Sequence, residues 1–80
     1  MKLPRNLNGT ELARALGIYG YEITRQKGSH IRVTTQVNGQ HHEVIPAHKP
    51  MKPGTLSSIL KSVARHQRIS TAELIVKLKL

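Results

Sequence analysis

The chain has 80 residues, of which 13 are Lys or Arg and only four are Asp or Glu, so its formal net charge is +9. Its length predicts one small domain over residues 1–80, and the absence of Cys excludes disulfides and thiolate metal sites. No apolar run resembles a signal peptide or approaches the ~20 residues that span a bilayer, so we expect a soluble, cytoplasmic protein with no membrane association. The excess of positive charge predicts a polyanionic partner, either nucleic acid or an acidic protein.

The first predicted helix covers residues 7–19. Asn8 is a suitable N-cap, and Glu11 three residues later completes an Asx version of the capping box. Gly20 is expected to end the helix in the left-handed conformation that favours glycine. The apolar stripe of this helix consists of Leu12, Ala15, Leu16 and Tyr19.

Two strands joined by a glycine turn are predicted next, because apolar and polar residues alternate on both sides of Gly28. We expect a three-residue loop over 26–28, with Gly28 in the left-handed conformation. A two-residue loop over 27–28 would instead bring Ile23 opposite Arg32 and mix the apolar and polar faces. The longer loop predicts the pairs Tyr21–Val33 and Ile23–Ile31 on the core side, and Glu22–Arg32 and Thr24–His30 on the other side.

A second hairpin turn is predicted at Asn38-Gly39, before a third strand over about 41–45. The register of this strand stays open. A two-residue turn would direct Val44 inward, whereas a three-residue turn would direct Ile45 inward.

Two helical segments complete the chain. One begins around Pro53 and has clean helical spacing of apolar residues, and a short one begins at Ser70, although its last five residues alternate like a strand. Together the elements predict an α+β fold of helix, three-stranded antiparallel sheet and helix (αβββα), with a short C-terminal helix. Both main helices have a single apolar stripe, so they can cover one face of the sheet and leave the other, with His30 and Arg32, in solvent.

The functional hypothesis depends on His30. An imidazole titrates near pH 6.5 and can act as base or acid at neutral pH, while Lys27 and Arg32 beside it could hold a phosphate. This combination suits RNA cleavage without a metal, in which a base removes the proton of the 2′-hydroxyl and an acid or cation assists the leaving oxygen. The alternative is a surface histidine beside a turn, without a role.

Four short motifs stand out along the chain: Asn8-Gly9-Thr10-Glu11-Leu12, Arg25-Gln26-Lys27-Gly28-Ser29-His30, Val44-Ile45-Pro46-Ala47-His48 and Lys52-Pro53-Gly54-Thr55-Leu56. Together they resemble the HicA family of toxins, the mRNA interferases of type II toxin-antitoxin systems, whose compact fold is related to the double-stranded RNA-binding domain. The resemblance covers roughly residues 7–65. It implies an endoribonuclease that acts on single-stranded mRNA without a cofactor, with His30 as the catalytic residue and a HicB-type antitoxin as partner.

Four further residues are candidates for substrate binding. Gly28 and Ser29 are expected to shape the site at the turn, and His48 and Lys52 to contact phosphate; for each, a purely structural or solvated role is the alternative. The pair His41-His42 does not predict a metal site, because adjacent strand residues point to opposite faces.

Two other functions are compatible with the composition. One is a non-catalytic RNA-binding module of the same fold, and the other is a DNA-binding or partner-binding accessory protein. In each case, a chain with two Tyr and no Phe or Trp has too few rings to stack bases, so affinity should come mainly from phosphate contacts.

Overall fold

The computed structural model describes residues 3–4, 6–47 and 50–80. Its elements, in order, are α1 (Gly9–Ala15), the 3-10 helix η1 (Leu16–Tyr19), β1 (Glu22–Lys27), β2 (His30–Thr35), β3 (His41–Pro46), α2 (Pro53–Gln67) and α3 (Thr71–Leu78). The strands form one antiparallel sheet in the order β1-β2-β3. The predicted α+β layout is therefore confirmed. Within the described ranges, no helix has the length and apolar character needed to cross a membrane.

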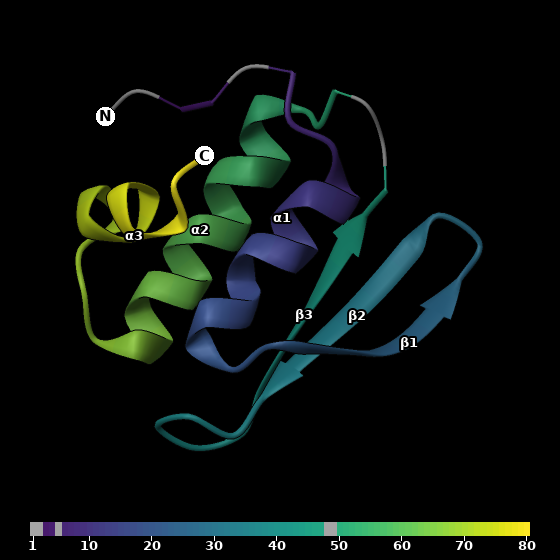
Figure 1. Ribbon diagram of the computed structural model, residues 1–80. Coiled ribbons are helices and arrows are strands. Elements are labelled where there is room, and N and C mark those ends of the chain that lie inside the picture. The colour runs from purple at the N-terminus through teal and green to yellow at the C-terminus, as the bar shows by residue number, and fades with distance from the viewer. Residues whose placement is uncertain (1–2, 5, 48–49) are drawn as a thin grey trace.

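The helices gather on one face of the sheet, as Figure 1 shows, and α3 packs beside α2. They cover β2 and β3, whereas every residue of β1 is exposed and the β1–β2 hairpin extends past the helices. The core thus lies between α1, α2 and the two covered strands. Its most buried side chains include Leu12, Leu16, Ile31, Val33, Ile45, Leu56, Leu60 and Val63.

The first helix begins as predicted. The Asn8 side chain accepts a hydrogen bond from the Glu11 N–H at 2.8 Å, and the Glu11 carboxylate accepts one from the Asn8 N–H at 3.4 Å. The last turn narrows to η1, and Gly20 ends it with a φ of 81°. Gly9 lies against the end of β3, where a Cβ would collide with the carbonyl of Pro46, so only glycine lets α1 approach the sheet this closely.

The β1–β2 hairpin differs from its prediction. Lys27 pairs with His30, so the turn consists of Gly28 and Ser29 rather than residues 26–28. Gly28 has the predicted left-handed conformation, with a φ of 58°. A bulge between Ile23 and Arg25 shifts the remaining register. The observed pairs are Glu22–Thr34, Ile23–Val33, Arg25–Arg32, Gln26–Ile31 and Lys27–His30.

The bulge explains why the predicted pairs were wrong. The prediction assumed strict alternation, in which only a longer loop keeps Ile23 on the core side. One extra residue, Thr24, achieves the same result with a two-residue turn. Ile23 does lie on the core side, but no helix covers this strand and the side chain remains 50% exposed.

The β2–β3 connection settles the open register of the third strand. Five residues, Gln36–Gln40, join Thr35 to its partner His41, and the predicted turn residues Asn38 and Gly39 both have positive φ. Ile45 points into the core, while Val44 is 52% exposed on the opposite face.

The C-terminal segment is a helix, despite its strand-like alternation. The Ser70 hydroxyl accepts a hydrogen bond from the Glu73 N–H at 3.0 Å and caps α3. Leu74 and Leu78, four residues apart, are buried by α3 packing on the rest of the core. The N-cap and the helical spacing of the two buried leucines therefore determine the structure of this segment, despite its alternation of apolar and polar residues.

Candidate functional site

The sheet face opposite the helices, called the open face below, presents the residue on which the functional hypothesis depends. Along β2, Ile31 and Val33 are buried, while His30 and Arg32 point the other way and are exposed. Over these four residues the strand alternation separates core and solvent sides as predicted, although Thr34, further along the open face, is buried. The imidazole of His30 is accessible to a large ligand.

An open cavity of about 190 Å³ lies on this face, lined by Arg25, Lys27, His30, Arg32 and Val44. Three permanent cations and one histidine therefore share a single hollow. Arg25 lies directly opposite Arg32, and Lys27 directly opposite His30. Like charges in opposed positions destabilise a sheet, so this arrangement has no structural benefit and favours an anionic ligand.

Arg25 is the residue that sequence reasoning missed. Strict alternation from the predicted loop placed it on the core side, whereas the bulge at Thr24 turns it onto the open face. Bulges commonly redirect a side chain next to a functional site. No pattern of apolar residues signals the bulge. The one available sign is that Arg25 is the first residue of the sequence motif that ends at His30.

The other predicted site residues differ in their placement. Gly28 and Ser29 form the turn next to the cavity without lining it, and the Ser29 carbonyl accepts a hydrogen bond from the Ala47 N–H at 2.6 Å. Lys52 is exposed at the N-terminus of α2 and does not line the cavity either. His48 lies outside the described residues. The structure thus brings Lys27 and Arg32 to His30, but not Lys52.

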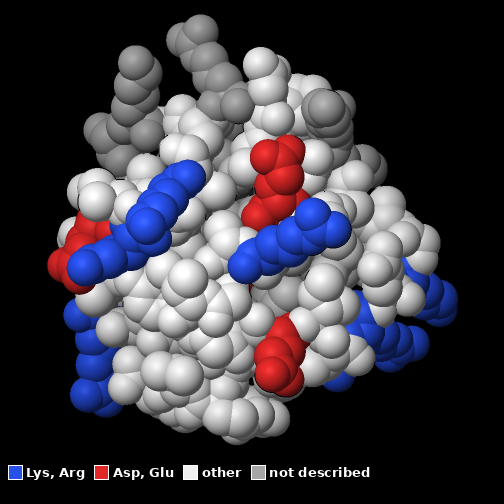
Figure 2. Space-filling model, in the orientation of Figure 1, with Lys and Arg blue, Asp and Glu red and all other residues white. Residues whose placement is uncertain are grey.

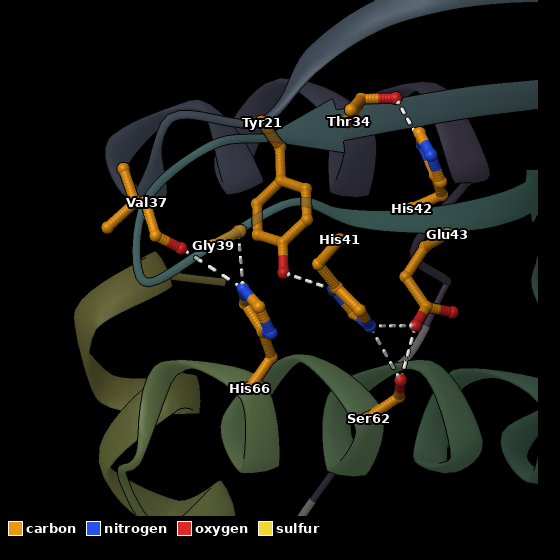
Figure 3. Close-up of polar contacts among 9 residues, drawn as sticks. All are labelled: Tyr21, Thr34, Val37, Gly39, His41, His42, Glu43, Ser62 and His66. Atoms are coloured by element: carbon orange, nitrogen blue, oxygen red, sulfur yellow. Dashed lines mark hydrogen bonds and ion pairs between the residues drawn. The ribbon is translucent and has the colours of Figure 1, made fainter.

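A second cluster of titratable side chains joins β3 to α2 (Figure 3). Nε2 of His41 lies 3.2 Å from both the Glu43 carboxylate and the Ser62 hydroxyl, and the hydroxyl donates to that carboxylate. Nδ1 of His41 lies 2.7 Å from the Tyr21 hydroxyl. Since a carboxylate only accepts, neutral His41 carries its proton on Nε2 and accepts from Tyr21 at Nδ1.

His66 on α2 completes this cluster. Its Nε2 lies 3.0 Å from the Val37 carbonyl and 2.9 Å from that of Gly39, so this nitrogen must be the donor to both. Burial lowers the pKa of His41 from its ordinary value; Glu43 opposes this shift, and His66 and His42 add to it. The cluster holds the β2–β3 loop and β3 against the helix.

Metal binding gains no support from this cluster. His41 points to the helix side and His42 to the open face, as strand alternation predicted. Across residues 3–4, 6–47 and 50–80, no three His, Asp or Glu side chains gather closely enough to hold a metal ion.

The helix side of the molecule has a different charge pattern. Figure 2 shows acidic and basic side chains interspersed there, with uncharged surface between them. The open face instead concentrates cations around one histidine. The electrostatic potential of the two sides therefore differs, and the cavity is the more attractive to an anionic group.

The chain matches a known protein family. Residues 9–64 fit the family model described as the HicA toxin of bacterial toxin-antitoxin systems. No curated protein and no solved structure matches the chain significantly. The matched range begins at the glycine that packs against β3, includes the whole sheet and its cavity, and ends within α2.

Proposed function

The chain belongs to the HicA toxin family of bacterial toxin-antitoxin systems, and from this premise we propose that it is a metal-independent endoribonuclease that cleaves single-stranded mRNA. The observation that carries the proposal is the exposed imidazole of His30 in a cavity that it shares with three cations. In this reaction the 2′-oxygen attacks the adjacent phosphorus, and the bond from phosphorus to the 5′-oxygen breaks. The products are a 2′,3′-cyclic phosphate and a 5′-hydroxyl.

His30 is the proton-transfer group of this mechanism. It either removes the proton from the attacking 2′-hydroxyl or donates one to the leaving 5′-oxygen, and well-placed acid–base catalysis contributes roughly 10²- to 10⁴-fold. Arg25, Lys27 and Arg32 neutralise the charge that develops on the non-bridging phosphate oxygens. Arg is suited to this task because two of its N–H groups can contact one phosphate.

RNA is selected over DNA by the reaction itself, because only RNA has the 2′-hydroxyl that attacks. Tyr21 is buried, and the described side chains that line the cavity include no Tyr, Phe or Trp ring on which a base could stack. Binding therefore depends mainly on the phosphate backbone. The logarithm of the RNA affinity should fall with the logarithm of salt concentration, with a slope of about −0.7 per neutralised phosphate.

The protein partner that we propose is a HicB-type antitoxin that covers the open face. The family is defined as the toxin of a toxin-antitoxin pair. An acidic surface on the partner would complement Arg25, Lys27 and Arg32 and would exclude RNA from His30.

The decisive experiment compares the wild type with His30→Ala on a long single-stranded RNA in excess chelator. We expect the wild type to cut the RNA and to leave cyclic phosphate ends, and the variant to bind RNA with nearly unchanged affinity without cutting it. A substrate with 2′-deoxy nucleotides should resist cleavage. Lys61→Ala on α2, which changes an exposed cation away from the cavity, serves as the matched control. Cleavage by His30→Ala at the wild-type rate, or loss of wild-type cleavage in chelator, would exclude this mechanism.

A non-catalytic RNA-binding module is the second candidate, and one observation favours it. Among the described residues, the side chains that line the cavity include one histidine and no carboxylate, so they offer His30 no obvious acid or base as a partner in proton transfer. In that case both the wild type and His30→Ala would bind RNA and neither would cut it.

A further inference from the structure

A chain of hydrogen bonds crosses the open face and ends on one of the cations of the cavity. The Arg32 Nε–H donates to Thr24 Oγ1 at 3.3 Å, and Thr24 Oγ1 lies 2.9 Å from Thr34 Oγ1. Thr34 Oγ1 in turn lies 2.7 Å from His42 Nδ1, the contact drawn at the upper right of Figure 3. The chain thus connects β1, β2 and β3 through side chains alone.

Thr24 occupies the central place in this chain. Its hydroxyl accepts from the Arg32 side chain and also lies 3.3 Å from the Arg32 backbone carbonyl, to which it can donate. The bulge creates this geometry, because Thr24 is the residue that the bulge inserts between Ile23 and Arg25. A two-residue turn without the bulge would place residue 24 opposite Val33, on the core side.

The contact constrains Arg32 in a useful way. A free arginine side chain samples many rotamers, and fixing it on binding costs conformational entropy. When Nε–H is held by Thr24, the N–H groups of the two terminal nitrogens still form a fork that can fit a phosphate. Arg32 and His30 line the same cavity, so the fork is held next to the imidazole.

We propose that Thr24 is a positioning residue, which holds the guanidinium of Arg32 beside His30 in the orientation that receives the scissile phosphate. This inference rests on the proposed function. Thr24 touches neither the imidazole nor the reacting atoms in this mechanism and acts only through Arg32.

The test compares Thr24→Val with Thr24→Ser in RNA cleavage. Valine keeps the shape and the strand propensity of threonine but lacks the hydroxyl, whereas serine keeps the hydroxyl. We expect Thr24→Val to lower kcat/KM by about three- to tenfold, in line with loss of one hydrogen bond, and Thr24→Ser to remain close to wild type. Thermal melting of both variants shows that they fold, and Thr24→Ala replaces Thr24→Val should the latter unfold.

A double-mutant cycle with Arg32→Ala separates positioning from a general structural effect. In the Arg32→Ala background, Thr24→Val should cause no further loss, because the side chain that Thr24 holds is already gone. The inference would be overturned by any of three results. Thr24→Val could cause an equal loss in both backgrounds, it could retain wild-type activity, or it could impair cleavage no more than Thr24→Ser does.

The inference and the proposed function can fail separately. If the wild type binds RNA without cutting it, the nuclease proposal fails. The role of Thr24 is then decided by measuring the Kd for single-stranded RNA of the wild type, Thr24→Val, Arg32→Ala and the double variant. An independent readout needs no RNA. In the NMR spectrum of the wild type, exchange of the Arg32 Nε–H with water should be slower than in Thr24→Val, and equal exchange would contradict the hydrogen bond on which the inference depends.

Discussion

The imidazole rings of His41 and His66 stack with their centroids 4.4 Å apart and their planes inclined by 13°. One ring comes from β3 and the other from α2, so the stack joins the sheet to its covering helix (Figure 3). A proton added to His41 would meet a second imidazole and a partly buried site, and both disfavour the charged ring. This relationship makes stability depend on pH.

Stability should decrease as the pH falls below about 6.5. The folded-state pKa of His41 is lowered, by burial first of all, so the unfolded chain binds the proton more tightly. The stabilisation is fully present above the unfolded pKa and is lost as pH falls through the lowered folded value. We expect the urea midpoint to drop between pH 7.5 and pH 5.5, and to drop less for His41→Gln. A midpoint that does not change over this range, or an identical slope in the variant, would contradict the role of His41.

Replacing Gly9 by Ala should destabilise the fold. A Cβ at this position would overlap the carbonyl of Pro46, a backbone group that cannot move aside cheaply. Overpacking of this kind typically costs about 1–3 kcal/mol. Chemical denaturation measures the effect. Gly17→Ala is the matched control, because no atom lies within 4 Å of the added Cβ and its φ is not positive, and it should be neutral or slightly stabilising.

The Thr35 hydroxyl is a second stability determinant. Its side chain is 1% exposed, donates to the Tyr19 carbonyl at 2.7 Å and accepts from the Val37 N–H at 3.0 Å. Thr35→Val keeps the shape but leaves both backbone groups unpaired, so we expect a loss of about 1–3 kcal/mol in the free energy of unfolding. The exposed Ser58→Ala should change stability by less than about 0.5 kcal/mol. Equal effects of the two substitutions would argue against this account.

Arg25→Ala should affect binding and stability in opposite directions. Arg25 lines the cavity and lies opposite Arg32, so its removal deletes a phosphate contact and also relieves a repulsion between like charges. RNA affinity should fall and its dependence on salt should become less steep, while the melting temperature stays equal or rises. Filter binding at several salt concentrations, with Lys61→Ala as control, tests this. A melting temperature lower than that of wild type would show that Arg25 has a structural role.

Much of the fold was predictable, because local signals and tertiary packing agree in most elements. The capping box at Asn8, the left-handed Gly20 and the turn at Asn38-Gly39 each follow from residues whose chemistry acts over a few positions. The side of the sheet on which His30 lies followed from simple alternation along β2, where burial confirms it.

The register of β1 was not predictable in the same way. This strand buries none of its residues, so no apolar pattern fixes its pairing, and the bulge at Thr24 depends on cross-strand contacts that are distant in sequence. For the same reason, neither Arg25 nor the link from Thr24 to Arg32 was visible in the sequence. The roles of His30 and of the cations around it remain predictions that the cleavage experiments test.

The exposure of β1 has a consequence for how this protein can diversify. Arg25, Lys27 and Thr24 project from a strand that contributes nothing to the interior, so substitutions there leave the packing of α1, α2 and the two covered strands intact. Mutational drift along this single edge can therefore change the charges that line the cavity without endangering the folded state.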